Sequence, residues 1–199
     1  MPDSRPVRVA VLISGAGSNM AALIDAGQRG DAPFEVVLVL SNKPDAGGLA
    51  VAEAKGVATG TVDHRSFGSD REAHEQAVDA ALTAHQVEAV ALAGYMRLLT
   101  PWLVNRWTGR MLNIHPSLLP KYPGLDTHAR AIAAGDAEAG CSVHLVTEGV
   151  DEGPVLGQAA VPVLADDTPA SLAQRVLAAE HALYPRALAD FCARQIRSL

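Results

Sequence analysis

An asparagine and a histidine stand two residues apart near the middle of the chain, at the end of a short apolar run. The run predicts a strand over 110–114. Because side chains two positions apart in a strand point the same way, Asn113 and His115 should share one side. A carboxamide can stabilise an oxyanion, and an imidazole can carry a proton near neutral pH. The pair is compatible with acyl chemistry, and equally with a core histidine beside a hydrogen-bonded amide.

The prolines that follow this pair shape the loop beyond it. Pro116, Pro120 and Pro123 all come within eight residues of His115. Proline lacks a backbone N–H and interrupts both helices and sheet ladders. The predicted strand should therefore end in a stiff, irregular loop.

Asp151 is the acid that could assist the histidine. It lies in a turn flanked by glycines, where aspartate often serves only to form the turn. If the turn folds toward the end of the 110–114 strand, the carboxylate could orient His115 and hold it protonated. The spacing alone does not bring the two side chains together, so both interpretations remain open at this point.

A glycine-rich turn near the N-terminus suggests an anion site. The turn, 14–19, separates an apolar run at 7–13 from a predicted helix at 20–28. A strand, a glycine turn and a helix present backbone N–H groups to an anion, and Ser18 or Asn19 could cap the helix or bind the ligand. Met20 replaces the third glycine of a dinucleotide fingerprint, and no Gly-Lys-Ser/Thr is present. A small phosphate pocket remains, with an ordinary tight turn as the alternative.

Alternating strands and helices predict the fold of the first half of the chain. Strands are expected at 7–13, 34–40, 57–62, 88–93 and 110–114, with helices at 20–28, 46–55, 69–85 and 100–106. This alternation favours an α/β fold with a doubly wound, mostly parallel sheet. Ligands of such sheets bind at the carboxyl ends of the strands, which places 17–19, 96–99 and 113–115 on one edge.

The second half of the chain has a different pattern. Thr127 should cap a helix that ends before Gly135, and strands at 141–147 and 155–163 should form an antiparallel extension of the sheet. A long C-terminal helix from 168 to about 194 should pack back over the sheet, kinked or split at Pro185. Ser69 should cap the 69–85 helix, in which His74 and His85 are expected to be solvated. No linker interrupts the chain, so 1–199 should form a single domain.

Composition restricts the class of protein. The 199 residues are 49% hydrophobic but only 4% aromatic, which predicts a large aliphatic core. A formal charge of −6 argues against nucleic acid as the main partner, and no apolar run suits export or membrane insertion. Cys141 and Cys192 are far apart and should be packing residues of a reduced, cytoplasmic protein. No cluster has the spacing of metal ligands.

Six segments together resemble the phosphoribosylglycinamide formyltransferases, a folate-dependent family of purine biosynthesis. They are ISGAGSN (13–19), AGYMRLL (93–99), LNIHPSLLPKYPG (112–124), SVH (142–144), VDEGP (150–154) and EHALYP (180–185). The resemblance runs from the first strand to about residue 190. It implies transfer of a formyl group from the co-substrate 10-formyltetrahydrofolate to the amine of glycinamide ribonucleotide, without a metal.

The resemblance also implies roles for individual residues. Asn113, His115 and Asp151 would be the catalytic trio. The ribonucleotide side would comprise Gly17, Ser18, Asn19, Gly94, Met96, Pro116 and Glu180. The folate side would comprise Arg71, Met96, Arg97, Leu98, Leu99, Asn113, Val150 and Asp151. On this basis 1–110 would be the phosphate- and ribonucleotide-binding half, and 111–199 the catalytic and folate-binding half, acting on small molecules as a monomer or homodimer.

The implied chemistry is consistent with these residue types. As the amine attacks the formyl carbon, negative charge develops on the formyl oxygen, where the amide of Asn113 and a protonated His115 would stabilise it. Asp151 would favour the protonated imidazole. Protons would then move from the attacking nitrogen to the departing folate nitrogen.

Two positions of the sequence depart from the family pattern. Ala16 replaces a frequent asparagine, and Asp126 replaces a frequent histidine, so neither Asp126 nor His128 is assigned a role.

Another member of the same superfamily is the nearest alternative. A formyltetrahydrofolate hydrolase normally has an extra N-terminal domain, whereas this chain begins at its first strand. A methionyl-tRNA formyltransferase would need a basic RNA-binding domain, and an oxidoreductase would need the missing dinucleotide fingerprint. A non-catalytic phosphate-binding module is the remaining alternative.

Overall fold

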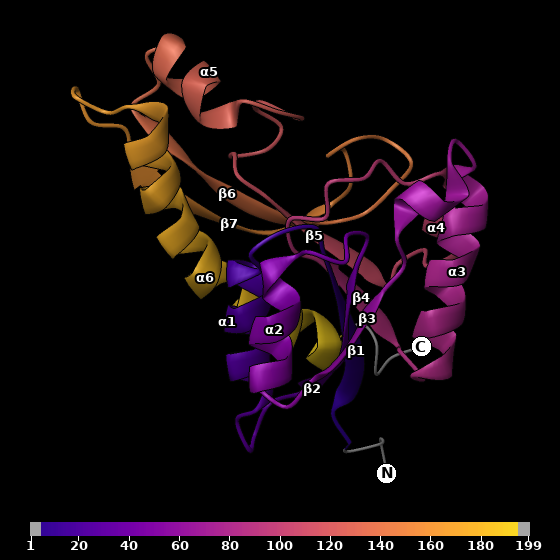
Figure 1. Cartoon of the computed structure of the whole chain (residues 1–199). Helices are drawn as coiled ribbons and strands as arrows, with labels where there is room; N and C mark the ends of the chain where they lie inside the picture. The colour runs from indigo at the N-terminus through magenta and orange to yellow at the C-terminus, as the bar shows by residue number, and fades with distance from the viewer. Residues whose placement is uncertain (1–4, 195–199) are drawn as a thin grey trace.

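The computed structural model describes residues 5–194, which form a sheet covered by helices on both faces (Figure 1). The strands are β1 (Val7–Ile13), β2 (Phe34–Ser41), β3 (Ala58–Thr61), β4 (Ala89–Leu92), β5 (Met111–His115), β6 (Glu138–Leu145) and β7 (Val155–Pro162). The helices are α1 (Ser18–Gly27), α2 (Gly47–Ala54), α3 (Arg71–Ala84), α4 (Pro101–Arg106), α5 (Thr127–Ala133) and α6 (Pro169–Arg194), with a 3-10 turn η1 (His64–Phe67).

The strand order explains where a ligand can bind. The sheet runs β3-β2-β1-β4-β5-β6-β7; the pairs among β1 to β5 are parallel, and β6 and β7 add an antiparallel extension. The chain moves outward from β1 to β3 and then returns to place β4 on the other side of β1. The loops after β1 and β4 therefore diverge at the carboxyl ends of these strands, which is the usual position of a crevice in such folds. The predicted fold class is confirmed.

Two aliphatic cores hold the sheet between its helices. Along β1 the side chains alternate, so that Val9 and Val11 pack into one core and Ala10 and Leu12 into the other. The first core lies under α1 and α6, and the second under α3 and α4, in agreement with the two helical layers of Figure 1. A strand buried on both faces reads as the continuous apolar run seen at 7–13.

Several details differ from the predictions. The N-cap of α1 is Gly17 rather than Ser18 or Asn19, that of α3 is Asp70 rather than Ser69, and that of α5 is Asp126 rather than Thr127. Asp70 is the better cap because its carboxylate accepts from Ala73 N at 2.9 Å, satisfying a first-turn N–H.

Two further predictions concerned single residues of helices. The one for His74 was wrong: His74 is 2% exposed rather than solvated, because its Nε2 contacts Val62 O at 3.0 Å and its ring packs edge-on against Phe67. Of the two outcomes expected at Pro185, a kink or a split, the split does not occur, because α6 continues through Pro185 as one element. Neighbouring Tyr184 is fully buried, and its hydroxyl donates to Leu92 O on β4, which ties this part of α6 to the sheet.

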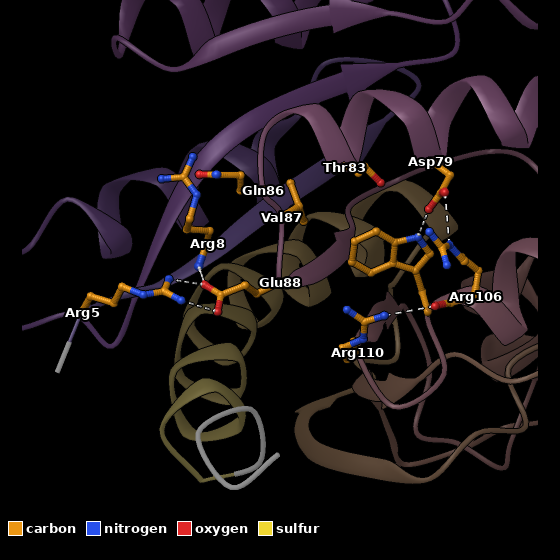
Figure 2. A pocket seen from close by; sticks show the side chains of 10 residues that line it. Arg5, Arg8, Asp79, Thr83, Gln86, Val87, Glu88, Arg106 and Arg110 are labelled. Atoms are coloured by element: carbon orange, nitrogen blue, oxygen red, sulfur yellow. Dashed lines mark hydrogen bonds and ion pairs between the residues drawn. The ribbon is translucent and has the colours of Figure 1, made fainter. Parts of the chain in front are cut away.

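A cleft of about 650 Å³ lies at the opposite edge of the sheet, where β1, β4 and β5 begin (Figure 2). Four arginines line it, and Arg106 pairs with the Asp79 side chain of α3. Two others bind carbonyls at the ends of helices: Arg8 donates to His85 O after α3, and Arg110 donates to Arg106 O at the end of α4. Cations stabilise the carbonyl end of a helix. These contacts explain the arginines as part of the fold.

No helix within residues 5–194 is long and apolar enough to cross a membrane.

Candidate active site

The carboxyl end of β5 brings Asn113 and His115 next to two polar residues of β6. In the antiparallel register Asn113 lies opposite His144, and His115 lies opposite Ser142. Ser142 is fully buried, donates to Ser117 O at 2.7 Å and accepts from Leu119 N at 3.0 Å. The strand pair therefore also fixes the beginning of the proline-rich loop.

Asp151 does fold toward this pair. Its Oδ2 lies 3.3 Å from His115 Nδ1, and its Oδ1 lies 3.5 Å from both Asn113 Nδ2 and His144 Nε2. Gly124 N donates to Oδ2 at 2.9 Å, and the Asp151 side chain is only 10% exposed. These contacts agree with the interpretation in which the Asp151 carboxylate orients His115.

Both ring nitrogens of His115 face oxygen atoms. Its Nε2 lies 2.9 Å from Tyr122 O, an acceptor, and its Nδ1 lies 3.3 Å from Oδ2 of the Asp151 carboxylate. An imidazolium, with an N–H on each nitrogen, would suit both neighbours. His115 is only 6% exposed, and a poorly solvated site strengthens such contacts.

His144 is a member of the cluster that the sequence did not assign. Its Nδ1 lies 2.9 Å from Leu145 O, and its Nε2 lies 3.2 Å from Asn113 Nδ2 and 3.5 Å from Asp151 Oδ1. His144 thereby orients the Asn113 amide and contacts Asp151. Its alternation with Ser142 in the 141–147 run was the available signal, but the register with Asn113 was needed to interpret it.

The environment of Asp151 favours its charged form. Burial alone would raise the pKa of this carboxyl, but the hydrogen bond to His144, the N–H of Gly124 and the charges of the two histidines outweigh burial and lower the pKa below its ordinary value. Asp151 is therefore a carboxylate throughout the neutral range. A fixed negative charge is what an imidazolium at position 115 requires.

The glycine loop after β1 adjoins this cluster through β4. Gly17 adopts the left-handed region (φ 71°), and an added Cβ would lie 2.8 Å from Met20 Cε and 3.2 Å from Gly48 Cα. Ser14 binds the loop after β4, because its N donates to Gly94 O and its Oγ accepts from Met96 N at 2.8 Å. The first-turn N–H groups of α1 at Ser18 and Asn19 have no partner within the helix and can bind an anion.

Asn19 connects this loop to the C-terminal helix. It is buried, and its Nδ2 donates to Glu180 Oε2 at 2.7 Å. Burial raises the pKa of Glu180, and the Asn19 donor partly opposes that shift. The other side-chain oxygen of Asn19, Oδ1, is buried and has no hydrogen-bond partner among the described residues. Asn19 is not the helix cap, because it is the second residue of α1.

The segment after β4 carries the residues expected on the folate side. Met96 and Leu98 are 66% and 63% exposed, and Arg71 Nη2 donates to Leu98 O at 2.6 Å. Glu75, a buried carboxyl that the sequence did not indicate, fixes the end of this segment by accepting from Thr100 N at 2.7 Å and from its hydroxyl. Leu92 of β4 pairs with Asn113 of β5, so the segment begins beside the catalytic candidates.

The remaining candidates fall on the same edge or close to it. Pro116 directly follows His115, and Val150, half exposed, directly precedes Asp151. Asp126 adopts a left-handed conformation at the start of α5, and the Nε2 of His128 is buried without a partner among the described residues.

Within residues 5–194, no group of three or more His, Cys, Asp or Glu side chains is placed to hold a metal ion.

The two cysteines are confirmed as packing residues. Cys141 and Cys192 are both buried and reduced. Burial raises the pKa of the Cys141 thiol to about 12. A thiol with so high a pKa is a poor nucleophile at neutral pH.

Residues 7–188 match the family described as formyl transferase. A solved phosphoribosylglycinamide formyltransferase from Brucella melitensis is 57% identical and superposes with a TM-score of 0.91, covering 95% of this chain and 97% of the other. The phosphoribosylglycinamide formyltransferase of Escherichia coli is 47% identical over 93% of this chain and 87% of its own length.

A longer relative is similar over part of its length. The trifunctional purine biosynthetic protein adenosine-3 of Drosophila melanogaster is 50% identical over 95% of this chain, and the chain spans only 14% of that protein. The family match covers residues 7–188, and the likeness to the two shorter relatives extends over most of their length. Both are consistent with the cluster of Asn113, His115 and Asp151 at the end of β5. The chain belongs to the formyl transferase family.

Proposed function

We propose that this protein is a phosphoribosylglycinamide formyltransferase, which transfers the formyl group of 10-formyltetrahydrofolate to the amine of glycinamide ribonucleotide in purine biosynthesis. The observation that carries the proposal is the contact set around His115, in which a buried imidazole faces the Asp151 carboxylate beside the Asn113 amide. Relatives with this activity in their names match over nearly the whole chain.

The cluster suits the charge changes of formyl transfer. When the amine attacks, the formyl carbonyl becomes a tetrahedral oxyanion. Asn113 Nδ2 and His115 Nε2 would donate to that oxygen in exchange for their present contacts with Asp151 and Tyr122 O, each stabilising it by about 3 kcal/mol. A proton then passes from the attacking nitrogen to N10 of the folate as the bond between N10 and the formyl carbon breaks. His115 ends the cycle protonated, as it began.

The loop after β1 suits the ribonucleotide. The N–H groups of Ser18 and Asn19 would hold the phosphate monoester, with Gly17 allowing close approach. The unpartnered Asn19 Oδ1 could accept from a ribose hydroxyl, and Glu180 lies next to it. Gly94, Met96 and Pro116 would lie between the phosphate and the amine. Adjacent strands are about 4.8 Å apart, so the ends of β1 and β5 are about 10 Å apart, which a ribonucleotide can span.

The exposed segment 96–99 suits the folate. Met96 and Leu98 offer apolar surface to a pterin ring, and Arg97 and Arg71 offer positive charge to its glutamate carboxylates. Val150 and Asp151 would close the same side. Because Asn19 reaches Glu180, the proposed ribonucleotide half 1–110 and catalytic half 111–199 would work as one domain, as a monomer or homodimer. Small-molecule substrates are consistent with the cytoplasmic location predicted from the sequence.

Absorbance of the folate tests the proposal. The purified protein is mixed with 10-formyltetrahydrofolate, with and without glycinamide ribonucleotide, and the release of tetrahydrofolate is followed. We expect turnover that depends on the ribonucleotide. Turnover that ignores the ribonucleotide would indicate a hydrolase, and binding of the ribonucleotide without any turnover would indicate a phosphate-binding module.

Substitution of Gly17 by valine should weaken ribonucleotide binding. The β-branched side chain would collide with Met20 and Gly48, and the left-handed φ of 71° disfavours it. We expect the KM for glycinamide ribonucleotide to rise at least about tenfold, with the KM for the folate nearly unchanged. Gly30→Ala is the matched control, because a Cβ there meets no atom within 4 Å. Equal increases in both KM values would contradict the assignment of the loop.

Substitution of Arg71 by alanine should affect the folate. The change removes a charged donor from Leu98 O and a cation from the folate side. We expect the KM for 10-formyltetrahydrofolate to rise about three- to tenfold while kcat stays within about twofold. Arg65→Ala is the control, because Arg65 is an exposed arginine paired with Asp63. A fall in kcat with an unchanged folate KM would argue against this role.

A further inference from the structure

One short segment of the proline-rich loop touches both members of the charged pair. The Tyr122 carbonyl lies 2.9 Å from His115 Nε2, and two residues later Gly124 N donates to Asp151 Oδ2 at 2.9 Å. The segment therefore spans the His115–Asp151 contact from the open side. Any displacement of the segment would change both contacts at once.

The backbone at Tyr122 is in a conformation that its side chain does not favour. Tyr122 has φ 54°, in the left-handed region, which is an outlier for a bulky residue. Its carbonyl direction, which His115 depends on, follows from that conformation. Since the conformation is locally unfavourable, contacts elsewhere must maintain it.

The Tyr122 side chain makes those contacts with α5 and the turn after it. Its hydroxyl donates to Asp136 Oδ2 at 2.8 Å, and the Arg130 guanidinium lies 5.0 Å above its ring. Arg130 Nη1 also donates to Pro123 O at 2.7 Å and to Leu125 O at 3.2 Å. Arg130 thus holds the backbone that follows Tyr122, while Asp136 accepts the hydrogen bond from the Tyr122 hydroxyl. We call Tyr122, Arg130 and Asp136 the tyrosine clamp.

We propose that Tyr122 is a positioning residue for the formyl transfer, and that the tyrosine clamp keeps its carbonyl where it holds the His115 Nε2–H ready for the formyl oxygen. The kinetic part of this inference rests on the proposed function. The charged and titratable groups that face His115 are Asp151, with His144 behind it, and His128 from α5, whose pKa burial and the charge of His115 both lower. Of the groups around the ring, the Tyr122 carbonyl alone contacts Nε2 in the described structure.

Two substitutions test the clamp from different sides. Arg130→Gln removes the cation and its fork to the two carbonyls, and Tyr122→Phe keeps the ring but removes the bond to Asp136. Lys121→Gln is the matched control, because Lys121 pairs with the other oxygen of Asp136 and is 58% exposed. We expect Arg130→Gln to lower kcat about tenfold or more and Tyr122→Phe severalfold, because small displacements of a reacting group are costly. Both KM values should stay within about twofold in all three variants.

Nitrogen NMR of the His115 ring gives a readout that does not need turnover. The His115 signals are assigned by their loss in His115→Asn. We expect the Nε2 signal of the parent protein to show the hydrogen bond to Tyr122 O, and to shift in Arg130→Gln and Tyr122→Phe but not in Lys121→Gln. A parent protein without turnover would refute the proposed function alone, since the spectra still decide the positioning role.

Two results would overturn the inference. One is unchanged His115 spectra and unchanged kcat in both clamp variants. The other is a fall in activity that matches a fall in the folded fraction, measured by thermal unfolding, with unchanged His115 spectra, because that result would give the clamp a structural role only.

Discussion

Substitution of His115 by asparagine should lower kcat about 1,000-fold, which corresponds to about 4 kcal/mol of transition-state stabilisation. Asparagine still fills much of the site and can donate to Asp151, but it carries no positive charge. The oxyanion would then have the Asn113 amide as its remaining donor in the trio. Because the loss falls on the transition state, the KM values should change less than about threefold. Steady-state kinetics with both substrates measure the effect.

The control for this substitution is His85→Asn. His85 is a half-buried histidine whose Nδ1 bonds to Ala81 O at the end of α3, far along the chain from the cluster. We expect its kcat to stay within about twofold of the parent value. A His115→Asn variant that keeps more than about a tenth of the parent kcat would show that the imidazolium is not the main source of oxyanion stabilisation.

Substitution of Asp151 by asparagine should lower kcat about 100- to 1,000-fold. Asparagine keeps the shape and can still accept from Gly124 N, but it cannot balance the charge of His115 at 3.3 Å. The contact between His115 Nδ1 and a carboxylate is then lost, and the ring is oriented less firmly. Asp167→Asn is the matched control, because Asp167 pairs with Arg175 at the start of α6, away from the cluster.

The same substitution should change the dependence of stability on pH. The pKa of Asp151 is lower in the folded protein than its ordinary value of about 4, so its contribution to stability is present above pH 4 and is lost as the pH falls through the folded value. Asp151→Asn should therefore lose less stability than the parent protein between pH 5 and the acid range, as measured by denaturant unfolding. A steeper acid loss in the variant would contradict the contacts assigned to Asp151.

Much of the fold could be predicted because it depends on local patterns. The run at 7–13 is apolar at every position but Arg8, which a strand between two helical layers requires, and β1 occupies that range. The alternation of Asn113 and His115 likewise placed both at the end of one strand. Local patterns could not predict that the Asp151 side chain lies next to His115. Its position depends on a backbone φ of 55° at Asp151 and on the contact with Gly124, and both arise from the folded loop.

The errors have a common physical cause. His74 and the caps of α1, α3 and α5 were assigned from residue preferences, which tertiary contacts can override. Asn19 is an acceptable cap by preference, but it lies inside α1, and its Nδ2 donates to Glu180, which lies 161 residues away in the sequence. His144 acquires its place from pairing with Asn113 across two strands. Local sequence patterns do not show which residues distant in the chain become partners, and these contacts depend on such partners.

A single-turnover experiment with a 13C-labelled formyl donor tests whether the cluster of Asn113, His115 and Asp151 transfers a formyl group. Excess protein, glycinamide ribonucleotide and labelled 10-formyltetrahydrofolate are mixed and quenched, and the products are identified by mass. We expect the label to appear on the ribonucleotide at the rate at which tetrahydrofolate is released, and His115→Asn to slow both about 1,000-fold together. Label recovered as formate, or transferred equally fast by His115→Asn, would contradict formyl transfer at the cluster of Asn113, His115 and Asp151.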